Sequence, residues 1–436
     1  MRTKHVKPTL APPCAIEYSN IHPIEFFHPA YPQSTPPLLA LAAVDKTDDG
    51  MSGLDHETAK IACGIVAGNK WDDETYFATK DANTNKWVKV IPPSDGILPA
   101  GPAYYFIVET QHQYPVTPSF DHWRFPHDRL PELWSTLSIP DATGRISGDE
   151  TDGCSSTRYR DRSCRITGSL ENTEGAHLVP VACSEWFKDN RMGKYGRMFS
   201  VFNAIDDERN LLLLRSDIHG LFDKNRFAII PKQIQDTGMD SPDCILMTHA
   251  ILPKGSYEIS HFYHNRALQP VMGIAREYLF ARFAMSIFCD ELCDFFGGPS
   301  QYKIRLYDRK TGEESIEDLY GKEVKTRSQI FPSAGNRLRS INPKRREMTP
   351  NGQGVALSTR SFSPRPWDED ESTSSDESQR EDKTHDQTDN ETNDETHCQA
   401  ERGRKRMRSV DYYRGLTPEQ GYQQGNISLL KRQRPE

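Results

Sequence analysis

The chain has 436 residues, enough for two or three domains, and its mean hydropathy of −0.72 is low for a chain that folds throughout. Its net charge is −8, but residues 368–397 contain 13 carboxylates and two basic side chains, a local charge of −11. The rest of the chain is therefore about +3, and an acidic total does not argue against a nucleic-acid partner. Nine cysteines without a CxxC pair, and no run of about 18 apolar residues, argue against a zinc ribbon, a disulfide framework and a membrane span, and favour an intracellular protein.

The N-terminal third divides into three parts by composition. Residues 1–40 are rich in proline and are expected to be irregular. Residues 41–145 form an α+β region of unknown function: "HETAKIACGIVAGNKW" has the apolar spacing of a helix, and "KWVKVIPPSDGILPAGPAYYFIVET" predicts two strands around a Pro/Gly turn. Residues 146–163, rich in Gly, Ser, Asp and Arg, are expected to form a polar linker.

The next segment carries short strands and one short helix. A strand is predicted near Cys164, followed by a polar turn and a second strand that delivers His177. The apolar run Leu211–Leu214 leads either into a short helix capped by Ser216 or into a helix that begins earlier, near Arg209. The segment "RFAIIP" then predicts a final strand.

Apolar spacing in residues 272–296 predicts a long helix that packs as a cap and completes a domain over residues 164–300. Residues 301–332 are expected to connect this domain to the tail. The tail, residues 333–436, is expected to be disordered, because it has too few apolar residues to offset chain entropy.

Two features of the tail suggest partners. The acidic block at 368–397 is expected to act as a protein-interaction segment or as a solvating spacer. The run "RGRKRMR", residues 402–408, is typical of a nuclear-import signal, and "NPKRRE", residues 342–347, would support it.

Polar groups bracket the leucines in "NLLLLRSDIHGLFD" (residues 210–223), and a histidine stands in "EGAHLVP" (residues 174–180) about thirty residues earlier. With "CRITG" before them and an apolar strand after them, these motifs resemble the HNH endonuclease family, in the branch with "AHLVP"- and "LLLRSDIHGLFD"-like sequences. The resemblance covers Cys164 to Lys232. It implies a ββα-metal fold, so the expected fold class is α+β: this core, a C-terminal helical cap, the N-terminal α+β region and the tail.

The resemblance also implies roles for three residues. His177 would be the general base that activates water for attack on a phosphodiester, since a neutral imidazole can take a proton near pH 7. Asn210 would hold the loop that carries His177. His219 would bind a divalent cation, Mg²⁺ or Mn²⁺, which neutralises the scissile phosphate and the leaving oxygen.

Many HNH enzymes place an acidic residue or a histidine directly before the base, as a metal ligand, and this chain has Ala176 there. A carboxylate from elsewhere would be needed, and the candidates are Glu174, Asp217 and Asp223. Asp223 is favoured because it follows His219 by one helical turn. The departure leaves an alternative open, in which the domain has lost catalysis and binds nucleic acid or a protein.

Basic residues in the connection "WFKDNRMGKYGR" indicate a nucleic-acid substrate. Lys188, Arg191, Lys194 and Arg197 would contact phosphates, which gives affinity that depends on salt and little on sequence. The alternative is a charged loop that is only solvated; the position between His177 and Asn210 favours contact with nucleic acid. The sequence therefore predicts a metal-dependent endonuclease acting on nucleic acid, DNA in preference to RNA, without a membrane partner and with the oligomeric state open.

Overall fold

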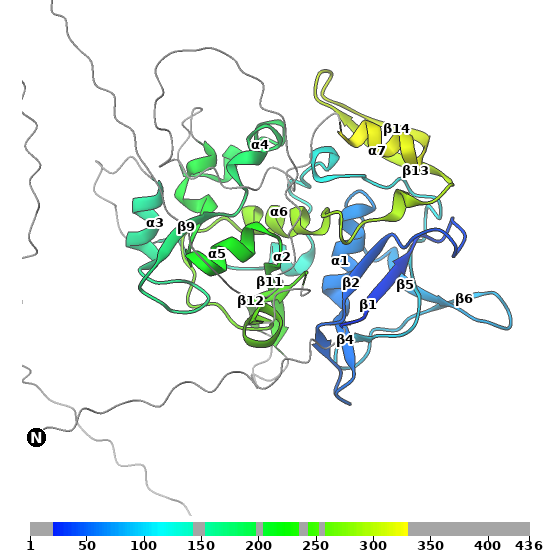
Figure 1. Ribbon diagram of the computed structural model, residues 1–436, viewed down its shortest axis with the longest axis horizontal. Coiled ribbons are helices and arrows are strands. Elements are labelled where there is room, and N and C mark those ends of the chain that lie inside the picture. The colour runs from blue at the N-terminus through cyan, green and yellow to red at the C-terminus, as the bar shows by residue number, and fades with distance from the viewer. Residues whose placement is uncertain (1–20, 143–152, 198–203, 235–242, 253–257, 330–436) are drawn as a thin grey trace, which may run out of the picture. The chain divides into compact units, whose positions relative to one another are not determined.

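The computed structural model describes residues 21–142, 153–197, 204–234, 243–252 and 258–329 (Figure 1). They belong to one compact unit, Met1–Thr349, and the second unit, Pro350–Glu436, lies outside the described residues. The expected disordered tail, its acidic block and its two basic runs therefore also lie outside the described part of the chain.

Two sheets form the N-terminal part. A five-stranded sheet has the order β2-β1-β8-β5-β6, in which only β1 and β8 run parallel. A three-stranded antiparallel sheet has the order β3-β4-β7. The strands are β1 (Pro23–Phe27), β2 (Leu39–Ala42), β3 (Asp45–Lys46), β4 (Ser52–Asp55), β5 (Thr75–Lys80), β6 (Trp87–Lys89), β7 (Ile97–Pro99) and β8 (Tyr104–Val108).

Helix α1 (His56–Val66) follows β4 directly. Asp55 caps it, because its carboxylate accepts a hydrogen bond from the Thr58 backbone N–H at 2.7 Å. Its apolar residues are buried and it contacts α6 (Arg276–Ile287), so one hydrophobic core runs from the N-terminal sheet to the second half of the described chain.

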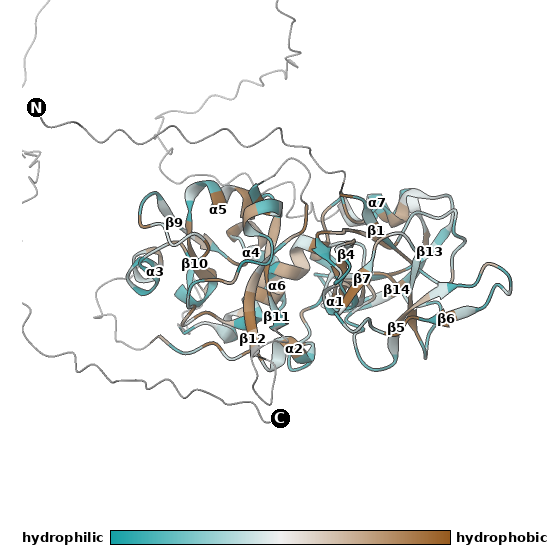
Figure 2. Ribbon diagram, turned by 90° about the horizontal axis from the view of Figure 1, so that it is seen from below, coloured by the Kyte–Doolittle hydropathy of each residue, from teal (hydrophilic) through white to brown (hydrophobic). Residues whose placement is uncertain are grey.

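The second half is built from two antiparallel strand pairs and several helices. β9 (Thr173–His177) pairs with β10 (Leu211–Arg215), and β11 (Phe227–Ile234) pairs with β12 (Asp243–Ala250). The helices are α2 (Glu132–Ser135), α3 (Gly153–Asp161), α4 (Ser184–Asp189), α5 (Ser216–Asp223) and α6. Hydrophobic residues gather on β10, β11 and α6, whereas α3 is hydrophilic (Figure 2).

A hairpin closes the described chain. β13 (Gln301–Asp308) pairs with β14 (Glu313–Tyr320), and α7 (Gly321–Gln329) follows. β13 also joins the N-terminal part, because Val116 pairs with Ile304 in a parallel bridge. Among the described residues, no helix is both long enough and apolar enough to cross a bilayer.

The mixed α+β class is confirmed, and so are the helix at residues 56–66, the strands on both sides of the Pro/Gly turn and the strand "RFAIIP". The predicted strand near Cys164 is wrong: residues 164–168 form a turn, closed by Gly168 N–H bonding to the Cys164 carbonyl oxygen at 2.9 Å. β9 pairs with β10 instead of with a strand near Cys164. The helix after the leucines starts at Ser216, not near Arg209, and Ser216 is its first residue rather than its cap.

Other boundaries also differ from expectation. The proline-rich range 1–40 contains β1, the expected linker at 146–163 contains α3, and the expected connecting range 301–332 contains β13, β14 and α7. The predicted long helix at 272–296 is shorter than expected: it spans Arg276–Ile287, and turns follow it.

Candidate active site

The β9–β10 ladder fixes where His177 lies. His177 pairs with Leu211 and Glu174 pairs with Leu214, so the histidine stands at the end of β9 next to the start of β10. The leucines of β10 are fully buried, which anchors the ladder in the core. The position of His177 is thus set by strand pairing as well as by its own contacts.

The outer edge of β10 is closed by α3 and the turn after it. The Leu213 N–H donates to the Asp161 carboxylate at 2.9 Å, and the Leu213 carbonyl oxygen accepts from the Arg165 N–H at 2.9 Å. Arg160 donates to the Leu211 carbonyl oxygen at 2.7 Å and forms an ion pair with Asp161. These contacts satisfy the backbone groups that a two-stranded ladder leaves open.

Asn210 is fully buried between the two motifs. Its Nδ2 donates to the carbonyl oxygens of Val179 (2.9 Å) and Ile205 (2.8 Å), and its Oδ1 accepts from the Val179 N–H at 2.9 Å. Its backbone oxygen accepts from Leu178 N–H at 2.8 Å. Asn210 therefore holds the two residues that follow His177, as well as the residue that precedes Asp206.

His177 has a carboxylate partner that sequence reasoning missed. Its Nε2 lies 3.0 Å from Oδ1 of Asp206, which ends the 3₁₀ turn Ala204–Asp206. The hydrogen bond from His177 is the main reason why the pKa of Asp206 lies below its ordinary value. The sequence offers no motif for Asp206; its one signal is a place between the two recognised motifs.

His219 lies between two carboxylates. Its Nδ1 is 3.0 Å from Oε2 of Glu174, and its Nε2 is 3.6 Å from Oδ2 of Asp223. The first distance is a hydrogen bond, whereas the second is too long for one. With the Nδ1 proton donated to Glu174, Nε2 keeps its lone pair and faces a carboxylate oxygen.

This donor set fits a divalent cation. A carboxylate on the far nitrogen fixes the tautomer of a metal-binding histidine, and the near nitrogen and a second carboxylate then supply ligands. Mg²⁺ in particular is held by one or two carboxylates and several waters. Within the described residues, no third such side chain joins His219 and Asp223 in a tight cluster, and no hydrogen bond links His177 to His219.

The other positions considered as ligands are engaged elsewhere. Asp217 pairs with Arg215 through two contacts of 2.7 Å, and this hydrogen bonding is the main cause that lowers the pKa of Asp217. Ala176 is fully buried in the core, so a longer side chain at this position would not fit without rearrangement. Glu174, two residues earlier on β9, reaches His219 instead.

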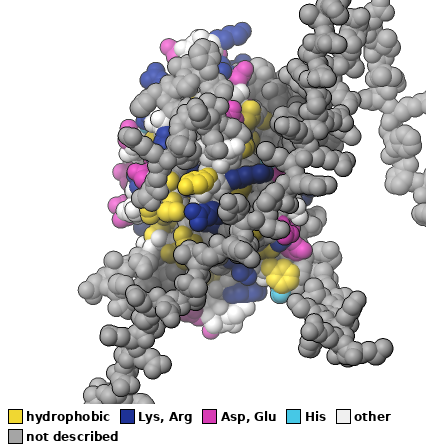
Figure 3. Space-filling model, turned by 90° about the vertical axis from the view of Figure 1, so that its left-hand side faces the viewer, with side chains coloured by type: hydrophobic (Ala, Val, Ile, Leu, Met, Phe, Trp, Pro, Cys, Tyr) yellow, Lys and Arg dark blue, Asp and Glu magenta, His cyan; other side chains and the backbone are white. Residues whose placement is uncertain are grey.

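The basic residues of the connection between the motifs differ in their contacts. Lys188, Arg191 and Lys194 are exposed, whereas Arg197 pairs with Glu208 at 2.6 Å. On the face that Figure 3 shows, Lys and Arg side chains lie among hydrophobic and acidic ones. Trp186 is buried and donates to the Trp123 carbonyl oxygen, so it packs rather than stacks on a ligand.

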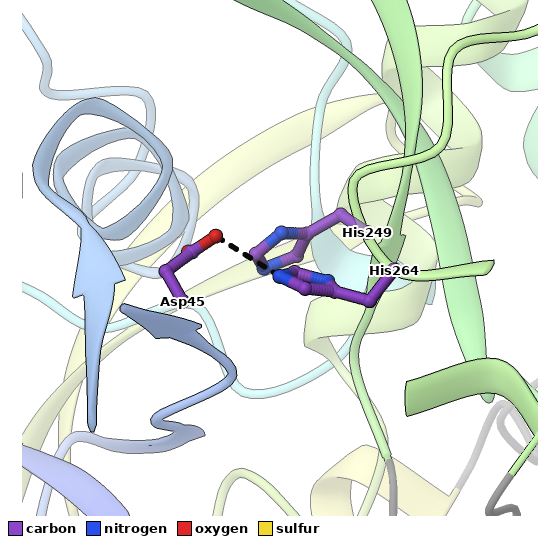
Figure 4. Close-up of side chains that lie close together, drawn as sticks. All are labelled: Asp45, His249 and His264. Carbon is purple, nitrogen blue, oxygen red and sulfur yellow. Dashed lines mark hydrogen bonds and ion pairs between the residues drawn. The ribbon is translucent and has the colours of Figure 1, made fainter. Parts of the chain in front are cut away.

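A second group of ionisable side chains lies outside the motifs. Asp45, His249 and His264 are close enough for one ligand atom of each to lie within 4.8 Å of the others (Figure 4). Sequence reasoning missed this group, because its members are far apart in the chain.

Two members of this group, Asp45 and His264, are already engaged in hydrogen bonds. Oδ1 of Asp45 accepts from His264 Nε2 (2.9 Å), Asn265 Nδ2 (2.8 Å) and Lys232 Nζ (3.0 Å). His264 Nδ1 accepts from the Ala250 N–H at 3.2 Å, which requires the His264 proton on Nε2, where a metal would bind. This arrangement fits a hydrogen-bonded carboxylate better than a metal centre.

Comparison with known protein families gives a match in this part of the chain. Residues 164–230 match the family model described as HNH endonuclease, which confirms the resemblance drawn from the sequence. No curated protein and no solved structure matches the chain.

Proposed function

We propose that the segment matching the HNH endonuclease family, residues 164–230, forms a metal-dependent nuclease centre that hydrolyses phosphodiester bonds in nucleic acid, with DNA as the preferred substrate. β9, β10 and α5 would be its ββα-metal core. The observation that carries the proposal is that His177 at the end of β9 and His219 in α5 each have a carboxylate partner, while Asn210 holds the residues that follow His177.

His177 is proposed as the general base. With the Nε2 proton donated to Asp206, its Nδ1 carries the lone pair that takes a proton from the attacking water. Asp206 holds the ring in this tautomer and orientation, as a carboxylate does for the histidine of a catalytic triad.

His219 and Asp223 are proposed to hold the cation, Mg²⁺ or Mn²⁺, and Glu174 to orient His219. A bound divalent cation supplies charge neutralisation at the phosphate and the leaving oxygen. Lys188, Arg191 and Lys194 are proposed to contact the phosphates on either side of the scissile bond, because they are exposed and lie between the motifs.

The test is nicking of supercoiled DNA, and cleavage of single-stranded RNA, with Mg²⁺ or Mn²⁺ and with EDTA. His177→Ala should slow cleavage by about 10² to 10⁴ while metal binding persists. His219→Ala should weaken metal binding, and a higher metal concentration should partly restore cleavage. The matched control is His112→Ala, since His112 is exposed and lies outside the matching segment. Equal activity of wild type and His177→Ala would assign the cleavage to a contaminant or another site.

Ala176 favours a second candidate function, a domain that binds nucleic acid or a protein without cutting it. This candidate is selected if the wild type binds DNA but shows no metal-dependent cleavage on any substrate. Nuclear import through residues 402–408 and protein binding through the acidic block remain proposals about residues outside the described chain.

A further inference from the structure

A cavity of about 300 Å³ lies in the N-terminal part, outside the segment that matches the nuclease family. It is formed by the turn after α1, the loop from Thr117 to Arg129 and the β13–β14 hairpin. Its size is at the lower end of the range for sites that bind small ligands.

The charged side chains that line the cavity are mostly cationic. They are Arg124, Arg129 and Arg305, with Glu314 as the one carboxylate of the lining. Glu314 pairs with Nη1 of Arg305 at 3.0 Å, so positive charge remains in excess.

Three buried polar atoms of this lining have no hydrogen-bond partner among the described residues: Thr117 Oγ1, Arg124 Nη1 and Arg305 Nε. Thr117 is 1% exposed, so solvent does not satisfy its hydroxyl freely. Buried polar groups are nearly always hydrogen-bonded in native proteins, and each of these three can donate. Three unsatisfied donors at one cavity indicate an acceptor that binds there.

Other contacts within the protein already hold Arg124 and Arg305 in place. Arg124 stacks 3.8 Å from the ring centroid of Tyr307 and donates through Nη2 to the Asp189 carbonyl oxygen. Burial lowers the pKa of Arg124, because it keeps solvent from the charged guanidinium. Arg305 lies on β13, where its N–H donates to the Val116 carbonyl oxygen at 3.0 Å.

Gly68 leaves room for one of these groups. Its φ is +75°, and a Cβ added there would lie 3.0 Å from Nε of Arg305. A larger residue would therefore be strained and would press on the guanidinium. The glycine keeps the approach to the Arg305 Nε free.

We propose that this cavity is a binding site for a phosphate group. Guanidinium groups present paired N–H donors that match the oxygens of a phosphate, and a hydroxyl donor beside them completes a set directed at a tetrahedral oxyanion. The phosphate can belong to a small phosphomonoester or to a nucleic-acid backbone. Arg124 and His127 contact the backbone of Asp189 and Asn190, so the site borders the basic connection of the proposed nuclease centre.

The experiment is isothermal titration calorimetry of the full chain in EDTA, so that the outcome does not depend on a metal or on cleavage. The probes are inorganic phosphate, a nucleoside 5′-monophosphate and a single-stranded oligonucleotide without a terminal phosphate. The variants are Thr117→Val, Arg305→Gln and Glu314→Gln. Lys86→Gln is the control, since Lys86 is exposed and lies outside the cavity.

Arg305→Gln should weaken phosphate binding by roughly tenfold or more, because a charge-assisted hydrogen bond is lost. Thr117→Val should weaken it severalfold without lowering the melting temperature, because no described residue makes a hydrogen bond with this hydroxyl. Glu314→Gln should strengthen binding, and Lys86→Gln should leave it unchanged.

The three probes identify the source of the phosphate. Binding of inorganic phosphate and the mononucleotide alone assigns the site to small phosphomonoesters or terminal phosphates. Binding of the oligonucleotide with the same sensitivity to Arg305→Gln and Thr117→Val assigns it to the backbone. The proposal is overturned if no probe binds, or if Arg305→Gln and Thr117→Val both bind every probe as the wild type does. His177→Ala should bind phosphate normally, which separates this result from failure of the proposed nuclease function.

Discussion

Asn210 illustrates how one residue secures the candidate site. Its side chain makes three hydrogen bonds to the backbone, two with Val179, which follows His177 by two residues, and one with Ile205, which directly precedes Asp206. Asn210→Ala should lower the free energy of unfolding by about 1–3 kcal/mol, because buried backbone groups lose their partners. Urea unfolding measures this change. The exposed Asn83 provides the control, and an Asn210→Ala loss no larger than that of Asn83→Ala would contradict the role.

The two carboxylates at His219 should differ in their effect on metal affinity. Asp223 faces the nitrogen that keeps a lone pair, whereas Glu174 accepts the proton of the other nitrogen. Asp223→Asn should weaken Mn²⁺ binding by more than Glu174→Gln, for which about tenfold is expected from loss of an orienting partner. Calorimetric titration with Mn²⁺ measures both, and Asp217→Asn is the matched control because Arg215 already engages Asp217.

A different result would relocate the ion. If His264→Gln abolished Mn²⁺ binding while Asp223→Asn did not, the metal would belong to the Asp45 group instead.

At the scale of single residues, spacing along a helix was enough to pair His219 with Asp223, since they lie four residues apart. It could not find Asp206, because 29 residues separate Asp206 from His177 in the chain.

At the scale of elements, the sequence predicted best where an element is apolar on its own. β11 and α1 have clear patterns of buried residues and were predicted. α3 was taken as linker because its residues are polar; it is held by Asp161 and Arg160, which bond to the backbone of β10. β1 was missed in a proline-rich range, although proline is tolerated at the first position of a strand, where Pro23 stands.

Helix α5, which carries His219 and Asp223, depends on α6 through one buried side chain. Arg282 is 1% exposed, stacks 3.8 Å from the Phe222 ring centroid and donates to the Phe222 carbonyl oxygen. Burial lowers the pKa of Arg282 to about 10, so the group is still charged at neutral pH. A positive charge at the C-terminal end of α5 also interacts favourably with the helix dipole.

Arg282→Met should therefore loosen the last turn of α5 while roughly preserving side-chain volume. Hydrogen–deuterium exchange should become faster for the amides at the end of α5. The free energy of global unfolding should change less than the free energy of local opening at the end of α5, because methionine removes a buried charge as well as a hydrogen bond. Arg276→Met, at the partly exposed start of α6, should leave the exchange of α5 unchanged. Unaltered α5 exchange in Arg282→Met would show that α6 does not support this helix.

At the scale of the whole molecule, buried histidines predict acid sensitivity. Burial lowers the pKa of His28 and of His122 to about 4, and it lowers that of His249 well below 6.5. Between pH 6.5 and 4 the unfolded chain takes up protons at these positions that the folded chain does not, so stability falls as the pH falls. His28 and His122 should each contribute on the order of 3 kcal/mol across this window.

Urea unfolding at a series of pH values between 7.5 and 4.5 tests this expectation. The free energy of unfolding should be nearly constant above pH 7 and should decline steadily below 6.5. His112→Gln should leave the profile unchanged, since His112 is exposed. A flat profile down to pH 5 would mean that the buried histidines accept protons in the folded state.

A buried ion pair links the N-terminal part to β11, the strand that follows the motifs at residues 174–180 and 210–223. Asp45 on β3 and Lys232 on β11 are 187 residues apart in the chain, and Oδ1 of Asp45 lies 3.0 Å from Nζ of Lys232. Burial by itself raises the pKa of Asp45, but the hydrogen bond from His264 and the charge of Lys232 outweigh it, so the pKa lies well below its ordinary value. No local pattern could have predicted such a pair, because each residue alone has the sequence surroundings of a surface charge.

Asp45→Asn should lower the free energy of unfolding by roughly 3–5 kcal/mol, because the Lys232 ammonium would remain buried without its partner. Lys232→Met alone should also destabilise, since the carboxylate would lose one of its donors. The double variant Asp45→Asn/Lys232→Met should be less destabilised than the sum of the two, because removing both charges avoids the uncompensated one. Urea unfolding of the four proteins in this cycle gives the coupling energy. Additive single effects would show that the two parts of the chain are held together by their shared hydrophobic core and not by this pair.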